Sequence, residues 1–197
     1  MNKNWLLIPT LLMTLSGTAG AVTLSLSPSS LTIPVSTDYS VDLVVSELDI
    51  PGGEVIGGFD VDISFDPTQA SFLGYNLGTS LGDEGLFEAV DFSLGDLGGG
   101  LIDLAEVSLL STPDLLAIQT ESFTLATLDF HCLGCGTSLI EIIANDPMLA
   151  VSDGFGLPLP VTIGGGTEVT QVPEPSVVLL LAAGMLALGF TKSRAKN

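Results

Sequence analysis

Residues 59–65 read Phe-Asp-Val-Asp-Ile-Ser-Phe, so that apolar and polar side chains alternate along the whole run. Successive side chains in a β-strand point to opposite faces, so this period of two predicts a strand with one buried face and one wet face. Residues 40–46 show the same alternation. Residues 122–130 are apolar or small on both faces, which predicts a central strand covered on each side.

Shorter runs along the chain extend this pattern. They predict further strands at residues 22–26, 31–35, 70–75, 87–94, 101–109, 138–144, 148–151 and 167–171. One short helix is expected at 112–118, with Thr112 as its cap and Pro113 in its first turn. A series of about nine to eleven strands predicts an all-β fold, namely a two-sheet β-sandwich with jelly-roll wiring, over residues 22–171.

The charges of this chain are distributed very unevenly. It has 23 Asp or Glu against four Lys or Arg, for a net charge of -19. The four cations all lie near the ends of the sequence, at Lys3, Lys192, Arg194 and Lys196. This polyanion excludes a nucleic-acid-binding role. Because only His131 can pair with a carboxylate inside the domain, the acids must be solvated, bonded to backbone N–H groups or neutralised by outside cations.

Residues 1–21 have the organisation of a secretory signal peptide. Lys3 precedes an apolar run over residues 5–15, and Ala19 and Ala21 occupy the small-residue positions that a signal peptidase requires. We expect cleavage before Val22 and export of the remainder. A short membrane anchor is the alternative, although the apolar run is short for a span and ends in small residues.

Residues 172–197 contain three parts in a fixed order. The motif Pro173-Glu174-Pro175 precedes an apolar span at 176–190 and a basic tail at 191–197. As a transmembrane helix this span is about 22 Å long, short of a hydrocarbon core of roughly 30 Å. The arrangement resembles the PEP-CTERM sorting signal of exported bacterial surface proteins. That resemblance implies an exosortase as processing partner, a transient stay in the inner membrane and a mature protein at the cell surface or in the extracellular matrix. An ordinary tail anchor is the alternative.

The predicted domain also resembles a known family. Residues 56–67, Ile-Gly-Gly-Phe-Asp-Val-Asp-Ile-Ser-Phe-Asp-Pro, and residues 123–130, Phe-Thr-Leu-Ala-Thr-Leu-Asp-Phe, are similar to strands of cohesin domains. The resemblance implies a nine-stranded jelly roll that binds dockerin modules, without catalysis, through an exposed sheet face. It also implies that Asp60 corresponds to an Asp used in partner contact. Asp62 and Ser64 share its outward face by the period of two, and a merely solvated face is the alternative.

Other motifs were weighed for chemistry. In an exported chain, Cys132 and Cys135 are expected to close a small disulfide, and the three His and Cys side chains are too few for a zinc site. Ser80 has the spacing of a nucleophile elbow, but Gly82 stands close to where the required helix should begin. We therefore predict no catalytic residue and no metal site. Calcium held by acidic loops is the one cofactor left open, since no EF-hand pattern is present.

Together these features predict an exported, non-catalytic binding module of the bacterial surface or exopolysaccharide matrix. Its ligand is a protein or a carbohydrate, although carbohydrate recognition is disfavoured because the only Trp, Trp5, lies in the signal peptide. The alternative function is a structural surface or matrix component without a specific ligand.

The C-terminal motif generates a direct prediction. If residues 172–197 are a sorting signal, mass spectrometry of the mature protein will find no peptide from the apolar span or the basic tail. Recovery of the intact C-terminus would instead identify an ordinary tail anchor. Peptides from residues 22–171 serve as the internal control for digestion and detection.

Overall fold

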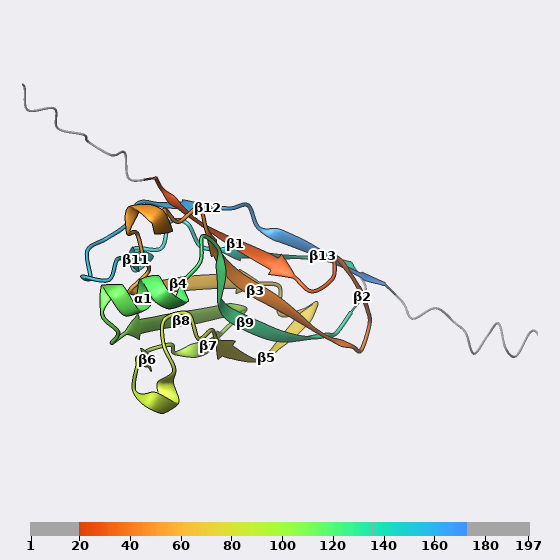
Figure 1. Ribbon diagram of the computed structural model, residues 1–197. Helices are drawn as coiled ribbons and strands as arrows, with labels where there is room; N and C mark the ends of the chain where they lie inside the picture. Colours follow the sequence, from red (N-terminus) through yellow and green to blue (C-terminus); the bar gives the residue numbers. More distant parts are fainter. Residues whose placement is uncertain (1–19, 135, 173–197) are drawn as a thin grey trace, which may run out of the picture.

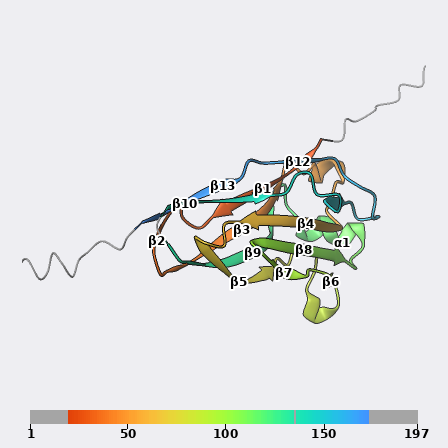
Figure 2. The same cartoon turned by 180° about the vertical axis from the view of Figure 1, so that it is seen from behind.

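The computed structural model describes residues 20–134 and 136–172. Two layers of β-strands pack face to face in it (Figures 1 and 2), which confirms the predicted all-β sandwich. The strands are β1 (Val22–Pro28), β2 (Thr32–Pro34), β3 (Asp38–Ser46), β4 (Gly58–Phe65), β5 (Ala70–Leu77), β6 (Ala89–Asp91), β7 (Gly95–Gly98), β8 (Leu101–Ser108), β9 (Phe123–Cys132), β10 (Gly136–Ile142), β11 (Ala150–Ser152), β12 (Val161–Ile163) and β13 (Thr167–Val172). The helices are the 3-10 turns η1 (Ile50–Gly52) and η2 (Glu84–Leu86) and the α-helix α1 (Thr112–Ile118). The PEP-CTERM motif, span and tail, and residues 1–19 of the signal peptide, lie outside the described residues.

Hydrogen bonding divides the strands between two sheets. Sheet A has five strands in the order β12-β1-β3-β9-β5. Sheet B has the order β2-β13-β10-β4-β8-β6, with β11 also paired to β4 and β7 also paired to β8. Because β4 and β8 are paired antiparallel through seven residue pairs, they form the rigid centre of sheet B.

Strand β4 follows the alternation of its sequence. Val61 and Ile63 are fully buried between the sheets, whereas Asp60, Asp62 and Ser64 are half-buried on the outer face. A shift of this strand by one residue would turn three polar side chains into the core. The period of two therefore sets the register of β4 as well as its existence.

The ring of Phe130 in β9 is the centre of an aromatic cluster in the core. Its fully buried ring stacks on Tyr39 at a centroid distance of 5.5 Å and meets the edges of Phe65 at 5.3 Å and Phe72 at 5.7 Å. Phe65 belongs to sheet B and the other rings to sheet A, so this cluster joins the two layers.

Several details differ from the sequence prediction. Strands β7 and β12 were not predicted, and residues 87–94 form only the three-residue β6 rather than one long strand. Helix α1 has the predicted bounds, but Ser111 precedes it as the cap position. Strand β9 buries one face, while its outer face is only half-buried and not covered by a further layer.

The aromatic cluster predicts a large effect of truncation. Replacing Phe130 by Ala should lower the free energy of unfolding by about 3–5 kcal/mol, because a fully buried ring leaves a cavity between the sheets. Urea unfolding measures this change. The matched control is Phe155→Ala, whose ring is 80% exposed and should cost little; equal losses in the two variants would contradict the account.

Candidate functional site

The three predicted partner residues lie together on the outer face of sheet B. Asp60, Asp62 and Ser64 alternate along β4 with half-buried side chains. In the register with β8, Asp62 lies directly opposite Asp103, and Asp60 lies opposite Ala105. The structure thus adds Asp103, which the sequence analysis did not single out, to the predicted set. We call Asp60, Asp62, Ser64 and Asp103 the acidic face.

The carboxyl groups of this face repel one another. Burial, followed by the nearby Asp103 and Asp146, raises the pKa of Asp60 above its ordinary value. Burial, followed by Asp146, Asp103 and Asp60, raises the pKa of Asp62 in the same direction. Like charges opposite each other on a sheet are destabilising, and the only ion pair within residues 20–134 and 136–172 is elsewhere. The acidic face therefore carries negative charge that no cation of the described chain offsets.

Exposed apolar side chains border the acidic face. Val107 lies on the same face of β8 as Asp103 and is 43% exposed, and Leu139 lies on the exposed face of β10. Phe92, which donates its backbone N–H to Ala105, is also exposed at the edge of this sheet. The outer face of sheet B therefore presents carboxylates with exposed apolar side chains near them, and a surface that combines the two can bind another protein.

The other sequence motifs lie away from this face. His131 on sheet A places its Nδ1 2.6 Å from the Asp38 carboxylate, which confirms it as a partner for an acid. Ser80 follows β5 but leads into the 3-10 turn η2 and not into an α-helix, so the nucleophile elbow is not formed. Cys132 is buried in the core, and the predicted disulfide stays a prediction because Cys135 lies outside the described residues.

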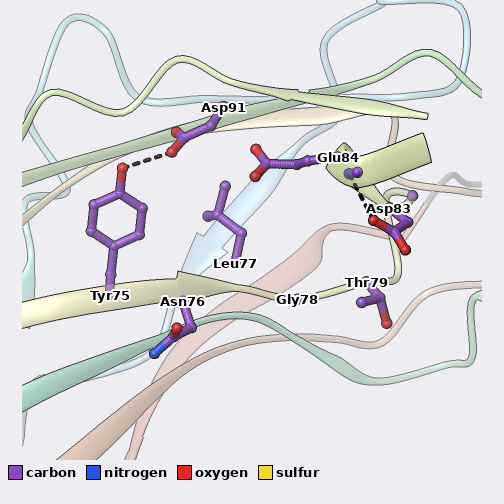
Figure 3. Close-up of a pocket in the computed structure, with 10 residues that line it drawn as sticks. Tyr75, Asn76, Leu77, Gly78, Thr79, Asp83, Glu84 and Asp91 are labelled. Carbon is purple, nitrogen blue, oxygen red and sulfur yellow. Dashed lines mark hydrogen bonds between the residues drawn. The ribbon is translucent and has the colours of Figure 1, made fainter. Parts of the chain in front are cut away.

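A cavity of about 450 Å³ lies at the edge of the sandwich, between the end of β5 and the segment that carries η2. Figure 3 shows Tyr75 on one side, Leu77 at the centre, and the carboxylates of Glu84 and Asp91 beside it. The Tyr75 hydroxyl donates to Asp91 at 2.7 Å. Asp83 accepts from the backbone N–H of Gly85 and is engaged in its own turn. The sequence analysis did not find this cavity, because its walls come from both sheets.

Glu106 is the most unusual acid of the domain. It is fully buried on β8, directly opposite Asp91 on β6, and neither carboxyl oxygen has a hydrogen-bond partner. Burial, followed by the charges of Glu84 and Asp91, raises its pKa to about 8. Its carboxyl group is therefore largely protonated at neutral pH. A signal for this position was present in the sequence, since Ile102, Leu104 and Glu106 are in phase along one strand.

Neither a metal site nor a membrane-spanning helix is found in residues 20–134 and 136–172. No group of three His, Cys, Asp or Glu side chains within them is arranged to hold a metal ion. No helix among the same residues has the length and apolarity needed to cross a membrane.

Comparison with known proteins places the architecture. No protein-family model and no curated protein sequence matches the chain. The solved structures are more informative. A type II cohesin from the cellulosome of Acetivibrio cellulolyticus has a TM-score of 0.61 at 14% identity, over 76% of this chain and 95% of that chain. A non-cellulosomal cohesin from Archaeoglobus fulgidus has a TM-score of 0.57 at 11% identity, over 80% and 96%. This chain has a cohesin-like fold.

One further cohesin-like neighbour was solved with a partner. The sixth cohesin of scaffoldin B from Acetivibrio cellulolyticus, in complex with a Cel5 dockerin variant, has a TM-score of 0.59 at 16% identity, over 78% of this chain and 100% of that chain. At these identities the likeness establishes the fold, and the cohesin-like β-sandwich predicted from the sequence is confirmed at that level.

The buried acid generates a pH-dependent prediction. Glu106 keeps its proton in the folded protein up to a pKa of about 8, whereas the unfolded chain loses it near the ordinary value of 4.5. Wild-type stability should therefore fall as the pH rises through this window, and Glu106→Gln should remove that contribution. We expect the stability of Glu106→Gln relative to wild type to increase by about 4 kcal/mol between pH 4.5 and 8.

Urea unfolding at several pH values measures this difference. Glu168→Gln, on the exposed face of β13, is the control for removing one negative charge. A constant difference between Glu106→Gln and wild type across the pH range would show that the buried carboxyl is not held neutral.

Proposed function

We propose that this protein is an exported, non-catalytic module that binds a protein partner through the acidic face of sheet B. The observation that carries the proposal is the cluster of Asp60, Asp62 and Asp103, which no cation of the described chain neutralises, at the centre of a flat sheet face. The cohesin-like fold supports a protein as the partner, because a structural neighbour was solved in complex with a dockerin. We infer a partner surface that presents Lys or Arg side chains to these carboxylates.

The charge distribution supports this choice of partner chemistry. Bringing a basic surface to the acidic face removes the repulsion between opposed carboxylates and pairs charges that otherwise face only water. Electrostatic attraction between such surfaces accelerates association and weakens as salt is added. A dockerin with a basic contact surface is the first class of partner to test.

The cellular setting belongs to the same proposal. A signal peptide at residues 1–21 and the PEP-CTERM-like segment at 172–197 support delivery to the cell surface or the extracellular matrix, with an exosortase acting on the precursor. In this setting the binding face would display its partner outside the cell.

Matched double variants test the face. Asp60→Asn/Asp62→Asn should weaken partner binding at least about tenfold, because two charge pairs are lost. The control Asp42→Asn/Asp129→Asn removes the same charge from the outer face of sheet A and should bind like wild type. Binding is measured by calorimetry against a panel of dockerin modules and by pull-down from surface-protein extracts.

The face variant should not unfold the protein. Because ionisation of Asp60 and Asp62 is disfavoured in the fold, their neutral amides should leave the stability at neutral pH unchanged or slightly raised. A partner that is captured equally by wild type, face variant and control binds somewhere else, and this result would reject the proposed face.

A further inference from the structure

The cavity at the sandwich edge is separate from the acidic face. The acidic face is on the outer side of sheet B, where Val107 also projects. Asp91 and Glu106 project on the other side of β6 and β8, and the cavity lies on that side. Its walls combine two kinds of surface: the Tyr75 ring and Leu77 on one hand, and the carboxylates of Glu84 and Asp91 on the other (Figure 3). Such a cavity accommodates a ligand with an apolar stem and a charged end.

The two acids at the cavity act on the same groups. Burial is the main cause that raises the pKa of Tyr75 and of Glu106, and the charges of Glu84 and Asp91 add to both shifts. Their carboxylates therefore concentrate negative potential in one place. Asp91 already accepts bonds from the Tyr75 hydroxyl and the Ser93 backbone N–H, which fix its orientation. The Glu84 side chain points toward Asp91 across the top of Leu77 (Figure 3).

Glu106 is buried behind Asp91 and is not itself part of the cavity wall. It is a fully buried acid with two unpartnered oxygens, and it projects from β8 on the same side as its cross-strand neighbour Asp91. A cation bound at Glu84 and Asp91 would favour the ionised form of Glu106, which burial otherwise disfavours. No Lys or Arg is available between residues 4 and 191 to do so, and the cation must therefore come from outside the domain.

We propose that this cavity binds an alkylguanidinium group, that is, the side chain of an arginine supplied from outside the domain. A guanidinium is planar and carries several N–H donors, so it can bond the Glu84 and Asp91 carboxylates together. Its face can stack on the Tyr75 ring, and its methylene stem can cover Leu77. A volume of about 450 Å³ suits such a side chain.

Calorimetric titration at low ionic strength tests the proposal with N-acetyl-arginine amide as the probe. We expect saturable one-to-one binding, and none with N-acetyl-citrulline amide, which has nearly the same shape but no charge. Glu84→Gln/Asp91→Asn should weaken binding about tenfold or more. Glu121→Gln/Glu168→Gln removes the same charge from exposed positions outside the cavity and should bind like wild type.

Two further titrations identify the source of the arginine and the kind of cation that the cavity binds. The peptide acetyl-Gly-Gly-Arg-Gly-Gly-amide should also bind if the arginine comes from a polypeptide, whereas binding of the single residue alone indicates a small metabolite. Calcium chloride should not displace the arginine probe. Displacement by calcium, equal binding of the citrulline probe, or equal weakening in both double variants would overturn the proposal.

Glu106 provides a readout that a purely structural role would not change. The charged groups that act on it are Glu84 on η2 and Asp91 on β6. A bound guanidinium favours the ionised form of Glu106, so binding near pH 7 should release protons, measured as a dependence of the heat on the buffer's ionisation enthalpy. Glu106→Gln should abolish this release while it still binds the probe. Unchanged proton release in that variant would exclude Glu106 from the site. The two experiments use different variants and different ligands. Failure here therefore leaves the proposed function untouched, and failure there leaves this cavity untouched.

Discussion

The lack of Lys and Arg between residues 4 and 191 is the constraint on which the rest of the structure depends. Without cations, the acids have to bond the backbone. Asp66 accepts from the Thr68 N–H and hydroxyl, and Asp153 accepts from the N–H groups of Phe155 and Leu157. The same local bond recurs at Asp83, Asp91, Asp96 and Asp146. These turns join the strands, so many acids shape the connections of the sandwich.

Some carboxylates do not accept a hydrogen bond from a turn, and they lie in two places, on β4 and on β8. On β4 the alternation that buries Val61 and Ile63 necessarily turns Asp60 and Asp62 outward, toward Asp103 of the neighbouring strand. In β8 the same alternation places an acid on the buried face. The phase that buries Ile102 and Leu104 also carries Glu106 inward. Both placements follow from strand geometry. Because burial keeps Glu106 protonated, only the outward cluster on β4 and β8 leaves charge without a counter-ion.

Much of the fold could be predicted from local patterns, because a strand with one buried face has apolar residues at every second position of its sequence. Residues 59–65 anticipated β4 and its face, and residues 112–118 anticipated α1. Strands β7 and β12 were missed because β7 is Gly-Asp-Leu-Gly and β12 has only three residues, so neither shows a period. Asp60, Asp62 and Ser64 were correctly placed on one outer face. Asp103 was not, because its position opposite Asp62 depends on pairing between strands.

The edge strand β6 connects the two charged regions. Its consecutive residues Val90 and Asp91 pair with Val107 and Glu106. Since successive side chains alternate, Val90 faces outward, whereas Asp91 lies on the other side and lines the cavity. A partner that binds the outer face near Val107 would thus also contact β6, which carries Asp91 on its other side. Any displacement of β6 on docking would also move Asp91 relative to Tyr75, which is bonded to it from sheet A. Strand β6 thus lies between the two regions, with Val90 on the outer side and Asp91 on the side of the cavity.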